Sequence, residues 1–208
     1  IHCVVGQVSI ESLGAIFAPS SKQASSNYGV GYDGRIGMYV EERDRSWCTS
    51  SSANDNRAVT IEVASDTYDP YKVTSAAYSG LLDLVTDICR RNGKSKLVWF
   101  GDKNTTLAYT PKSNEMVLTV HRWFANKSCP GDYLYNLHPQ IVTEVNRRLS
   151  GGTVNTGTAV SYQVKVTAKD GLNCRTAPIS GSVVTAYENG TILNISKEQN
   201  GWGYTGVG

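Results

Sequence analysis

Two histidines and one cysteine of this chain have the types and the spacing of metal ligands. His2 is the one strongly polar residue of the apolar run IHCVV. His121 follows the apolar stretch EMVLTV, and Cys129 stands eight residues after it, just before Pro130 and Gly131. Zinc commonly takes imidazole and thiolate ligands, and a catalytic site keeps three protein ligands so that the fourth position stays open. Two strand-borne histidines and one loop cysteine satisfy that count.

Two charged residues could complete such a site. Glu62 is the only carboxylate in the run VTIEVA, where burying a charge is costly unless it is paired or used. Beside a metal-bound water, a carboxylate can act first as a general base and then as an acid. Lys127 precedes Cys129 by two residues and could stabilise an oxyanion. The structural alternatives are an ion pair of Glu62 with Arg57, a solvated loop lysine and a core histidine at His2.

The composition indicates a globular protein. Of 208 residues, 40% are apolar and 18% are charged, and the net charge of +2 gives no argument for nucleic-acid binding. No apolar run approaches the ~18–20 residues of a membrane span. The chain opens at Ile1 without a charged-then-apolar leader and is expected to be trimmed there. Five cysteines lack the regular spacing of a disulfide framework: Cys3, Cys48, Cys89, Cys129 and Cys174.

Hydrophobic periodicity predicts an α/β domain that positions these residues. Apolar runs predict strands at 1–5 and 59–64, and the Asp33-Gly34 turn predicts a hairpin within 27–40. Helical spacing predicts helices after the capping residue Ser9, over 74–92 with Gly93 as C-cap, and over 139–149. We expect a catalytic domain at 1–149, a Gly/Ser/Thr-rich linker at 150–161, and a small all-β barrel at 162–208.

Four segments, in order, carry a family resemblance: IHC, NYGVGYDGRIGMYV, NRAVTIEVA and HRWFANKSCPGDYL. They resemble the zinc-dependent N-acetylmuramoyl-L-alanine amidases of the amidase-2 family, whose fold is shared with the peptidoglycan-recognition proteins. The resemblance covers residues 1–149 and implies a mixed central sheet flanked by helices. It also implies one Zn2+ ion held by His2, His121 and Cys129, with Lys127 as the family's lysine two residues before the third ligand.

Members of this family differ in the remaining catalytic residue. Some use a glutamate in a strand that resembles NRAVTIEV, which gives Glu62, and others a tyrosine in a segment that resembles NYGVG, which gives Tyr28. We expect Glu62 to move the proton and Tyr28 to assist as a hydrogen-bond donor, the alternative for Tyr28 being a packed strand residue. Trp47 resembles the family's position beside the substrate cleft, and a surface-packed tryptophan is its alternative.

The last part of the chain has a resemblance of its own. The segments KDGLNCRTAP, ENGTILNIS and NGWGY resemble a bacterial SH3-like cell-wall-targeting domain, which we expect to be cut short at Gly208. Together the resemblances imply a hydrolase that cleaves the amide between N-acetylmuramic acid and L-alanine of the stem peptide. Its partner would be the peptidoglycan of the bacterial cell wall, without nucleic acid or membrane insertion, and it would act there as a phage endolysin or a secreted autolysin.

Three other interpretations remain open on sequence alone. One is a peptidoglycan-binding protein on the same fold without catalysis. Another is a wall cysteine peptidase, in which Cys3 and His121 have the required order along the chain. The third is a structural zinc site with Cys48 as a fourth ligand, since closed sites normally have four.

Overall fold

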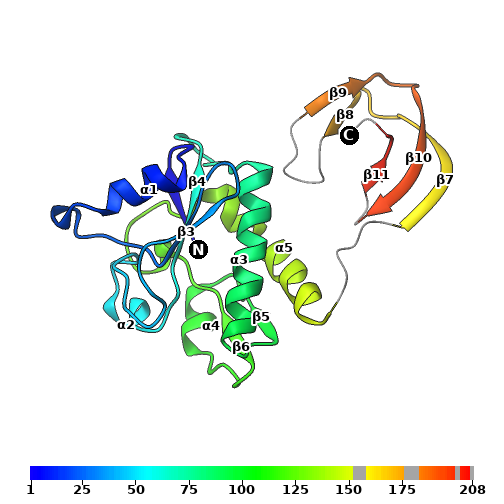
Figure 1. Cartoon of the computed structure of the whole chain (residues 1–208). Coiled ribbons are helices and arrows are strands. Elements are labelled where there is room, and N and C mark those ends of the chain that lie inside the picture. The colour runs from blue at the N-terminus through cyan, green and yellow to red at the C-terminus, as the bar shows by residue number, and fades with distance from the viewer. Residues whose placement is uncertain (152–157, 176–182, 200–201, 207–208) are drawn as a thin grey trace. The chain divides into compact units, whose positions relative to one another are not determined.

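The computed structural model describes residues 1–151, 158–175, 183–199 and 202–206 (Figure 1). The chain divides into two compact units, residues Ile1–Gly151 and Gly152–Gly208, which are described separately below. Half of the linker expected at 150–161, residues 152–157, and the end of the KDGLNCRTAP segment lie outside the described residues.

A four-stranded mixed sheet forms the centre of the first unit. Its strands are β1 (His2–Val5), β4 (Ile61–Ser65), β2 (Tyr28–Val30) and β3 (Ile36–Met38), in that spatial order. Strands β1, β4 and β2 run parallel, and β3 returns antiparallel to β2 through the Asp33-Gly34 hairpin. The mixed α/β architecture and the central mixed sheet expected from the sequence are therefore confirmed.

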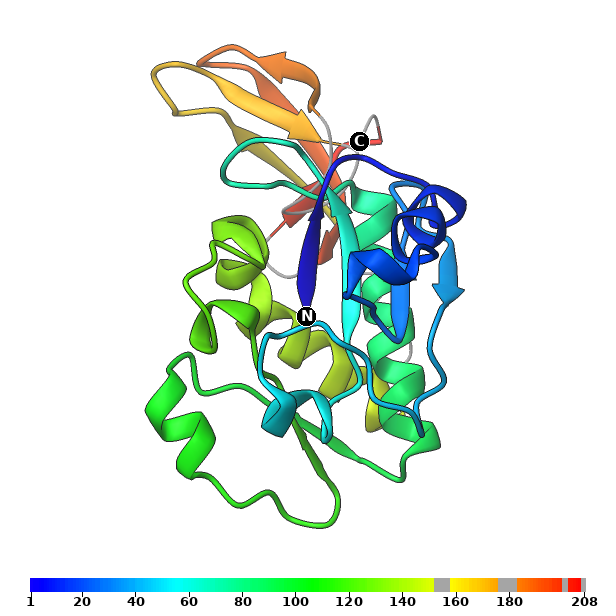
Figure 2. The same cartoon turned by 90° about the vertical axis from the view of Figure 1, so that its left-hand side faces the viewer.

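Helices cover both faces of this sheet (Figures 1 and 2). Helix α1 (Ile10–Phe17) contacts β2 and β3, whereas α3 (Ser75–Arg91) and α5 (Gly131–Leu149) pack on each other and on the parallel strands. Side chains of Ser9 and Thr74 accept the backbone N–H of Ser12 and Ala77, which caps α1 and α3 at their first turns. Both caps stand where the sequence predicts a helix start or next to it.

Helix α5 begins earlier than its sequence indicates. It starts at Gly131, eight residues before Pro139, which lies inside the helix although proline lacks the N–H of the helical ladder. Leu134, Leu137, Ile141 and Val145 form one buried stripe that continues past the proline. Burial of this stripe stabilises the helix across Pro139, so packing overrides the local signal.

The remaining part of the first unit carries the late ligands. A two-stranded parallel sheet, β5 (Lys96–Val98) and β6 (Glu115–Val117), lies beside α4 (Lys103–Ala108). Strand β6 ends at Val117, and His121 begins the 3-10 turn η2 (His121–Trp123). The prediction that His121 lies on a strand is therefore wrong. The pairing with β5 stops after three residues, and buried Leu118 and Val120 continue in irregular backbone. The other short elements are η1 (Ser20–Lys22) and α2 (Ser52–Asp55).

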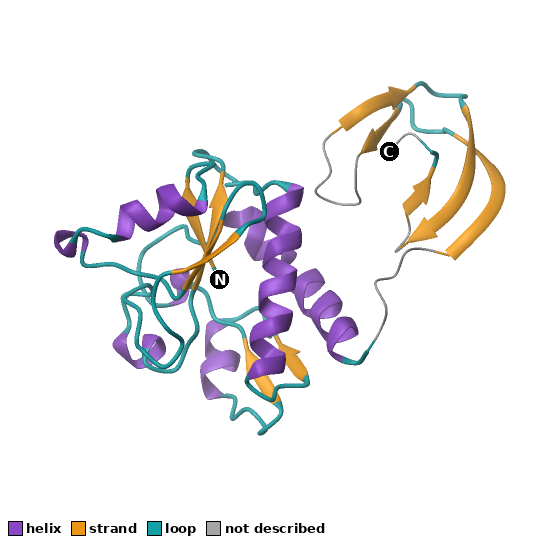
Figure 3. Ribbon diagram, in the orientation of Figure 1, coloured by secondary structure: helices purple, strands orange, loops and turns teal. Residues whose placement is uncertain are grey.

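The second unit is built of antiparallel strands (Figure 3). Strands β11 (Trp202–Tyr204), β10 (Ile192–Gln199) and β7 (Thr158–Lys165) form one sheet, and β8 (Leu172–Arg175) pairs with β9 (Val183–Tyr187). Val166, Leu193 and Ile195 form its small core. Strand β7 starts within the segment expected to be linker, because its residues pair with β10. These strands fit a small β domain.

Among the described helices, none combines the length and the apolar composition that crossing a lipid bilayer requires.

Candidate metal centre

The first expected ligand and the expected base are neighbours on the central sheet. His2 on β1 pairs in register with Glu62 on β4. Because side chains alternate along a strand, both project from the same face. Their sequence neighbours Cys3, Ile61 and Val63 project from the other face into the hydrophobic core. The period of two along β1 and β4 thus separates the polar pair from the core.

The structure brings His121 and Cys129 to this pair. One nitrogen of His2, one of His121 and the sulfur of Cys129 all lie within 4.8 Å of one another. Cys129 Sγ is 3.4 Å from His2 Nδ1, and the two imidazole centroids are 5.2 Å apart. The three residues that the sequence proposes as ligands therefore converge, although they come from a strand, a 3-10 turn and a loop.

Arg122 forms several hydrogen bonds with the loop that carries Cys129. Its backbone N–H donates to the Cys129 carbonyl at 3.0 Å. Its guanidinium donates to the Ser128 carbonyl and, at 2.9 Å, to the Asp132 carboxylate. The guanidinium carbon also lies 4.7 Å from the centroid of the Tyr135 ring. One arginine next to His121 therefore joins the second ligand, the third ligand and the start of α5. This role of Arg122 was not predicted from the sequence.

Because Gly131 has no side chain, the segment Pro70–Tyr71 can pack closely against the turn that follows Cys129. Its φ of +78° is a left-handed conformation that favours glycine, and a Cβ there would lie 2.8 Å from Tyr71 Cβ and 3.0 Å from the Pro70 carbonyl oxygen. The Tyr133 N–H also donates to that carbonyl, at 3.1 Å. The loop after β4 thus packs directly on the turn that follows the third ligand.

The protonation states suit metal binding at His2 and oppose it at the free thiol. Burial holds the pKa of His2 well below its usual value, so its imidazole is neutral and has a lone pair to offer. A hydrogen bond to Cys3, together with burial, raises the pKa of the Cys129 thiol. A metal ion must therefore displace the Cys129 proton when it binds, which makes binding dependent on pH.

Glu62 has the properties of a general base. Its Oε1 accepts a hydrogen bond from Cys48 Sγ at 3.6 Å, while its Oε2 is buried without a hydrogen-bond partner among the described residues. Burial raises the pKa of Glu62 to about 7. The described residues include no ion pair between Glu62 and Arg57, which was the structural alternative for this carboxylate. A buried carboxyl oxygen without a partner beside metal ligands is a candidate for proton transfer.

The segment 46–55 contacts both Glu62 and His121. Besides the Cys48 contact, Ser50 Oγ lies 3.2 Å from His121 Nε2. The buried Asp55 carboxylate accepts the backbone N–H groups of Cys48 and Thr49, at 3.3 and 3.1 Å, and so fixes the turn. Neither Ser50 nor Asp55 was predicted from the sequence as a site residue. The available signal was the cluster of Ser, Asn and Asp residues that follows Cys48, typical of side-chain-capped turns.

Lys127, two residues before Cys129, and Trp47, directly before Cys48, both have exposed side chains. No described residue forms a side-chain hydrogen bond or ion pair with Lys127, whose side chain projects into solvent. Trp47 is 53% exposed and immediately precedes Cys48. The Arg45 guanidinium lies 5.5 Å from its ring centroid, and both line a groove of about 300 Å³ together with Phe17. Trp47 is therefore a surface residue in contact with Arg45, and its role beside a substrate stays a prediction.

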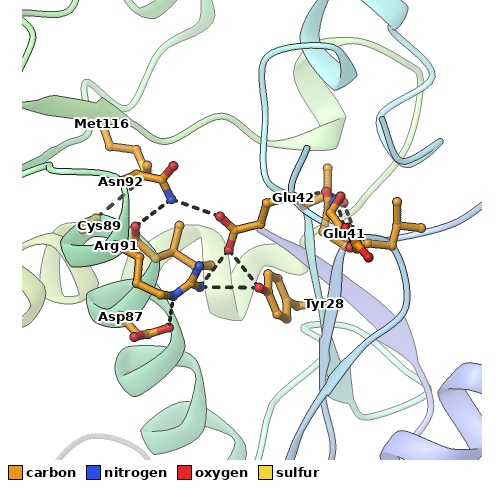
Figure 4. A network of polar contacts seen from close by, with 12 residues as sticks. Tyr28, Glu41, Glu42, Asp87, Cys89, Arg91, Asn92 and Met116 are labelled. Atoms are coloured by element: carbon orange, nitrogen blue, oxygen red, sulfur yellow. Dashed lines mark hydrogen bonds and ion pairs between the residues drawn. The ribbon is translucent and has the colours of Figure 1, made fainter. Parts of the chain in front are cut away.

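Tyr28 is not part of this cluster. It pairs in register with Ile61 rather than Glu62, so its side chain projects toward the α3 side of the sheet. Its hydroxyl donates to Glu42 Oε1 at 2.8 Å, and Arg91 donates to the same carboxylate oxygen at 2.7 Å (Figure 4). Tyr28 therefore fits the alternative interpretation, in which it is a tyrosine packed within its strand.

Two imidazoles, a thiol and a carboxylate with one unpaired oxygen lie together beside an α/β sheet, and they form a donor set of the kind that holds a catalytic metal ion. Residues 1–132 match the family model described as N-acetylmuramoyl-L-alanine amidase. The chain belongs to this amidase family, which acts on peptidoglycan. The matched range includes the three candidate ligands His2, His121 and Cys129, and also Glu62. Among curated proteins, none matches the chain significantly.

Proposed function

We propose that the first unit is a zinc-dependent amidase that hydrolyses the bond between the lactyl group of N-acetylmuramic acid and L-alanine of the stem peptide. The observation that carries the proposal is the convergence of His2, His121 and Cys129 within 4.8 Å, beside a carboxylate with one unpaired oxygen. Family membership supports the peptidoglycan substrate class.

The donor set fits zinc. Neutral imidazole and thiolate are ligands that this borderline-soft ion prefers, and three protein ligands are the number that a catalytic site uses. His2, His121 and Cys129 would hold the ion. When bound, zinc supplies a Lewis acid that polarises the scissile carbonyl and lowers the pKa of water.

Glu62 accepts the proton of the attacking water in this proposal. Water oxygen adds to the carbonyl carbon, and the proton passes from Glu62 to the amide nitrogen as the carbon–nitrogen bond breaks. The products are the lactyl carboxylate and a free L-alanine amine. A pKa of about 7 lets the same carboxyl group take up and release a proton near neutral pH.

Lys127 stabilises the negative charge that develops on the carbonyl oxygen. Its side chain is exposed and has no described side-chain partner, and it stands two residues before Cys129. A positioned ammonium group favours the charged transition state over the neutral ground state.

The second unit is proposed to be a bacterial SH3-like module that binds the cell wall. Its antiparallel strands and small apolar core are consistent with such a module. The place of action would be the bacterial cell wall, reached as a phage endolysin or as a secreted autolysin.

Digestion of purified cell walls tests the function. With zinc, we expect new N-terminal alanine and no new reducing sugar, and a chelator should abolish the reaction. New reducing ends would show cleavage of the glycan instead. Activity that survives chelation but is lost on alkylation by iodoacetamide would indicate a cysteine peptidase. Wall binding without cleavage would indicate a binding protein, and metal-dependent folding without activity a structural zinc site.

A further inference from the structure

The thiol of Cys48 is the one described side chain that forms a hydrogen bond with Glu62. Cys48 Sγ lies 3.6 Å from Glu62 Oε1, within the range of a sulfur hydrogen bond. The other carboxyl oxygen, Oε2, is buried and has no described partner. The two oxygens of the proposed base are thus unequal, because one is occupied and the other is free.

We propose that Cys48 is a positioning residue for Glu62. Its S–H donates to Oε1, which fixes the rotation of the carboxyl group and leaves Oε2 directed to the water that it deprotonates. The inference rests on the proposed amidase function and assigns a role to a cysteine that the proposed mechanism does not use.

The surrounding backbone holds this thiol in place. Asp55 Oδ2 accepts the Cys48 N–H at 3.3 Å, and Asp55 is itself buried. The preceding residue, Trp47, exchanges hydrogen bonds with Ser25, since its N–H donates to Ser25 Oγ and its carbonyl accepts the Ser25 N–H, both at 3.0 Å. The backbone is therefore held by hydrogen bonds at Cys48 itself and at the residue before it, as a positioning residue requires.

The competing role is that of a fourth metal ligand. Cys48, His2 and Glu62 also offer three donor atoms within 4.8 Å of one another. These two groups of donor atoms share only His2, and Cys48 is not grouped with His121 and Cys129, the other two candidate ligands. The side-chain hydrogen bond that the structure gives Cys48 is the one to Glu62 Oε1, so positioning is favoured.

Kinetics of three variants separate these roles. Cys48→Ala should lower kcat about tenfold, the effect of losing a hydrogen bond worth about 1.4 kcal/mol, with KM within about twofold and with bound zinc unchanged. Cys48→Ser keeps a donor and should recover most of the rate. Cys89→Ala removes a buried thiol of the α3 core and is the matched control, expected to leave kcat unchanged. In a Glu62→Gln background, Cys48→Ala should have no further effect.

Infrared spectroscopy tests the contact without reference to activity. The S–H stretching band of Cys48, assigned by difference from Cys48→Ala, should lie at lower frequency than that of a free thiol and should shift upward in Glu62→Ala. Loss of bound zinc in both Cys48→Ala and Cys48→Ser would overturn the proposal in favour of a ligand role. An unshifted S–H band, or equal rates in all three variants, would overturn it as well. If the wild-type protein has no amidase activity with zinc, the proposed function fails, and the infrared result alone decides whether Cys48 positions Glu62.

Discussion

His2 and Glu62 oppose each other in register across the parallel strands β1 and β4. A metal ligand and a proton acceptor are therefore fixed to adjacent positions of one sheet, where the ladder of hydrogen bonds holds their spacing. His121 and Cys129 come instead from irregular backbone, and Arg122 supplies the contacts that a strand would have given. The site thus combines a rigid half with a half that depends on side-chain contacts.

Glu62→Gln should abolish chemistry and leave the metal in place. The amide is nearly the same size but cannot accept a proton, so kcat should fall by about 10²–10⁴. Bound zinc, measured by atomic absorption after dialysis, should stay near the wild-type content. Glu41→Gln alters an exposed carboxylate and is the matched control, expected to leave both quantities unchanged. A Glu62→Gln enzyme with more than a tenth of wild-type kcat would remove Glu62 from proton transfer.

The raised pKa of Glu62 predicts a pH-dependent stability of the metal-free protein. Burial shifts this pKa from 4.5 to about 7, so the folded state binds the proton more tightly than the unfolded state. The free energy of unfolding should therefore fall as pH rises between those two values and level off above them. Glu62→Gln lacks this loss and should gain about 3 kcal/mol relative to wild type between pH 4.5 and pH 8.

Urea denaturation in chelator at both pH values measures that gain. Titrating groups that do not interact with Glu62 are present in both proteins and cancel in the difference. A gain that is the same at both pH values would show that Glu62 has an ordinary pKa in the folded protein.

Local patterns sufficed for much of the fold and for most of the site. Strand, hairpin and helix signals near His2, Asp33 and Thr74 are short-range, and the structure confirms these elements. Residue types and spacing, together with the family resemblance, indicated His121 and Cys129 as partners for His2, and the structure brings all three together. These features depend on local periodicity or on segments that are recognisable in isolation.

The features that sequence did not provide depend on long-range contacts. The side of the sheet that Tyr28 faces follows from its register with β4, which no local pattern shows. The start of α5 at Gly131 follows from a buried stripe that overrides Pro139. Contacts of Ser50 with His121 and of Cys48 with Glu62 join residues that are far apart in the sequence, and only the tertiary structure brings them together.

Gly131→Ala should weaken metal binding. The new methyl group would meet Tyr71 Cβ and the Pro70 carbonyl at 2.8 and 3.0 Å, so the turn after Cys129 must shift. Gly93→Ala is the matched control, because Gly93 also has a positive φ of 64° but has nothing within 4 Å of the added carbon. Both variants should lose about 1–2 kcal/mol from the strained φ. Gly131→Ala alone should lose further stability and zinc affinity, as measured by thermal denaturation and zinc titration. Equal zinc affinity in the two variants would contradict the role of this contact.

Lys127→Met should lower activity without a change in stability. The side chain is exposed and makes no described side-chain contact, so the free energy of unfolding should stay within about 0.5 kcal/mol of wild type. Loss of the oxyanion partner should lower kcat about 10²-fold. Lys103→Met replaces another exposed lysine, at the start of α4, and should leave kcat unchanged. If the two variants have the same kcat, Lys127 is a solvated loop residue.

Tyr28→Phe should cost stability rather than activity. The Tyr28 hydroxyl bonds to Glu42 on the side of the sheet that faces α3, so removing it should lower the free energy of unfolding by about 1 kcal/mol. Tyr39→Phe is the matched control, since the Tyr39 hydroxyl donates to the Ile10 carbonyl at 2.7 Å on the α1 side. Both variants should retain kcat within about twofold, because neither hydroxyl belongs to the metal cluster. A loss of kcat of about 100-fold in Tyr28→Phe but not in Tyr39→Phe, with bound zinc unchanged, would give Tyr28 the assisting role that its place in the sequence suggests.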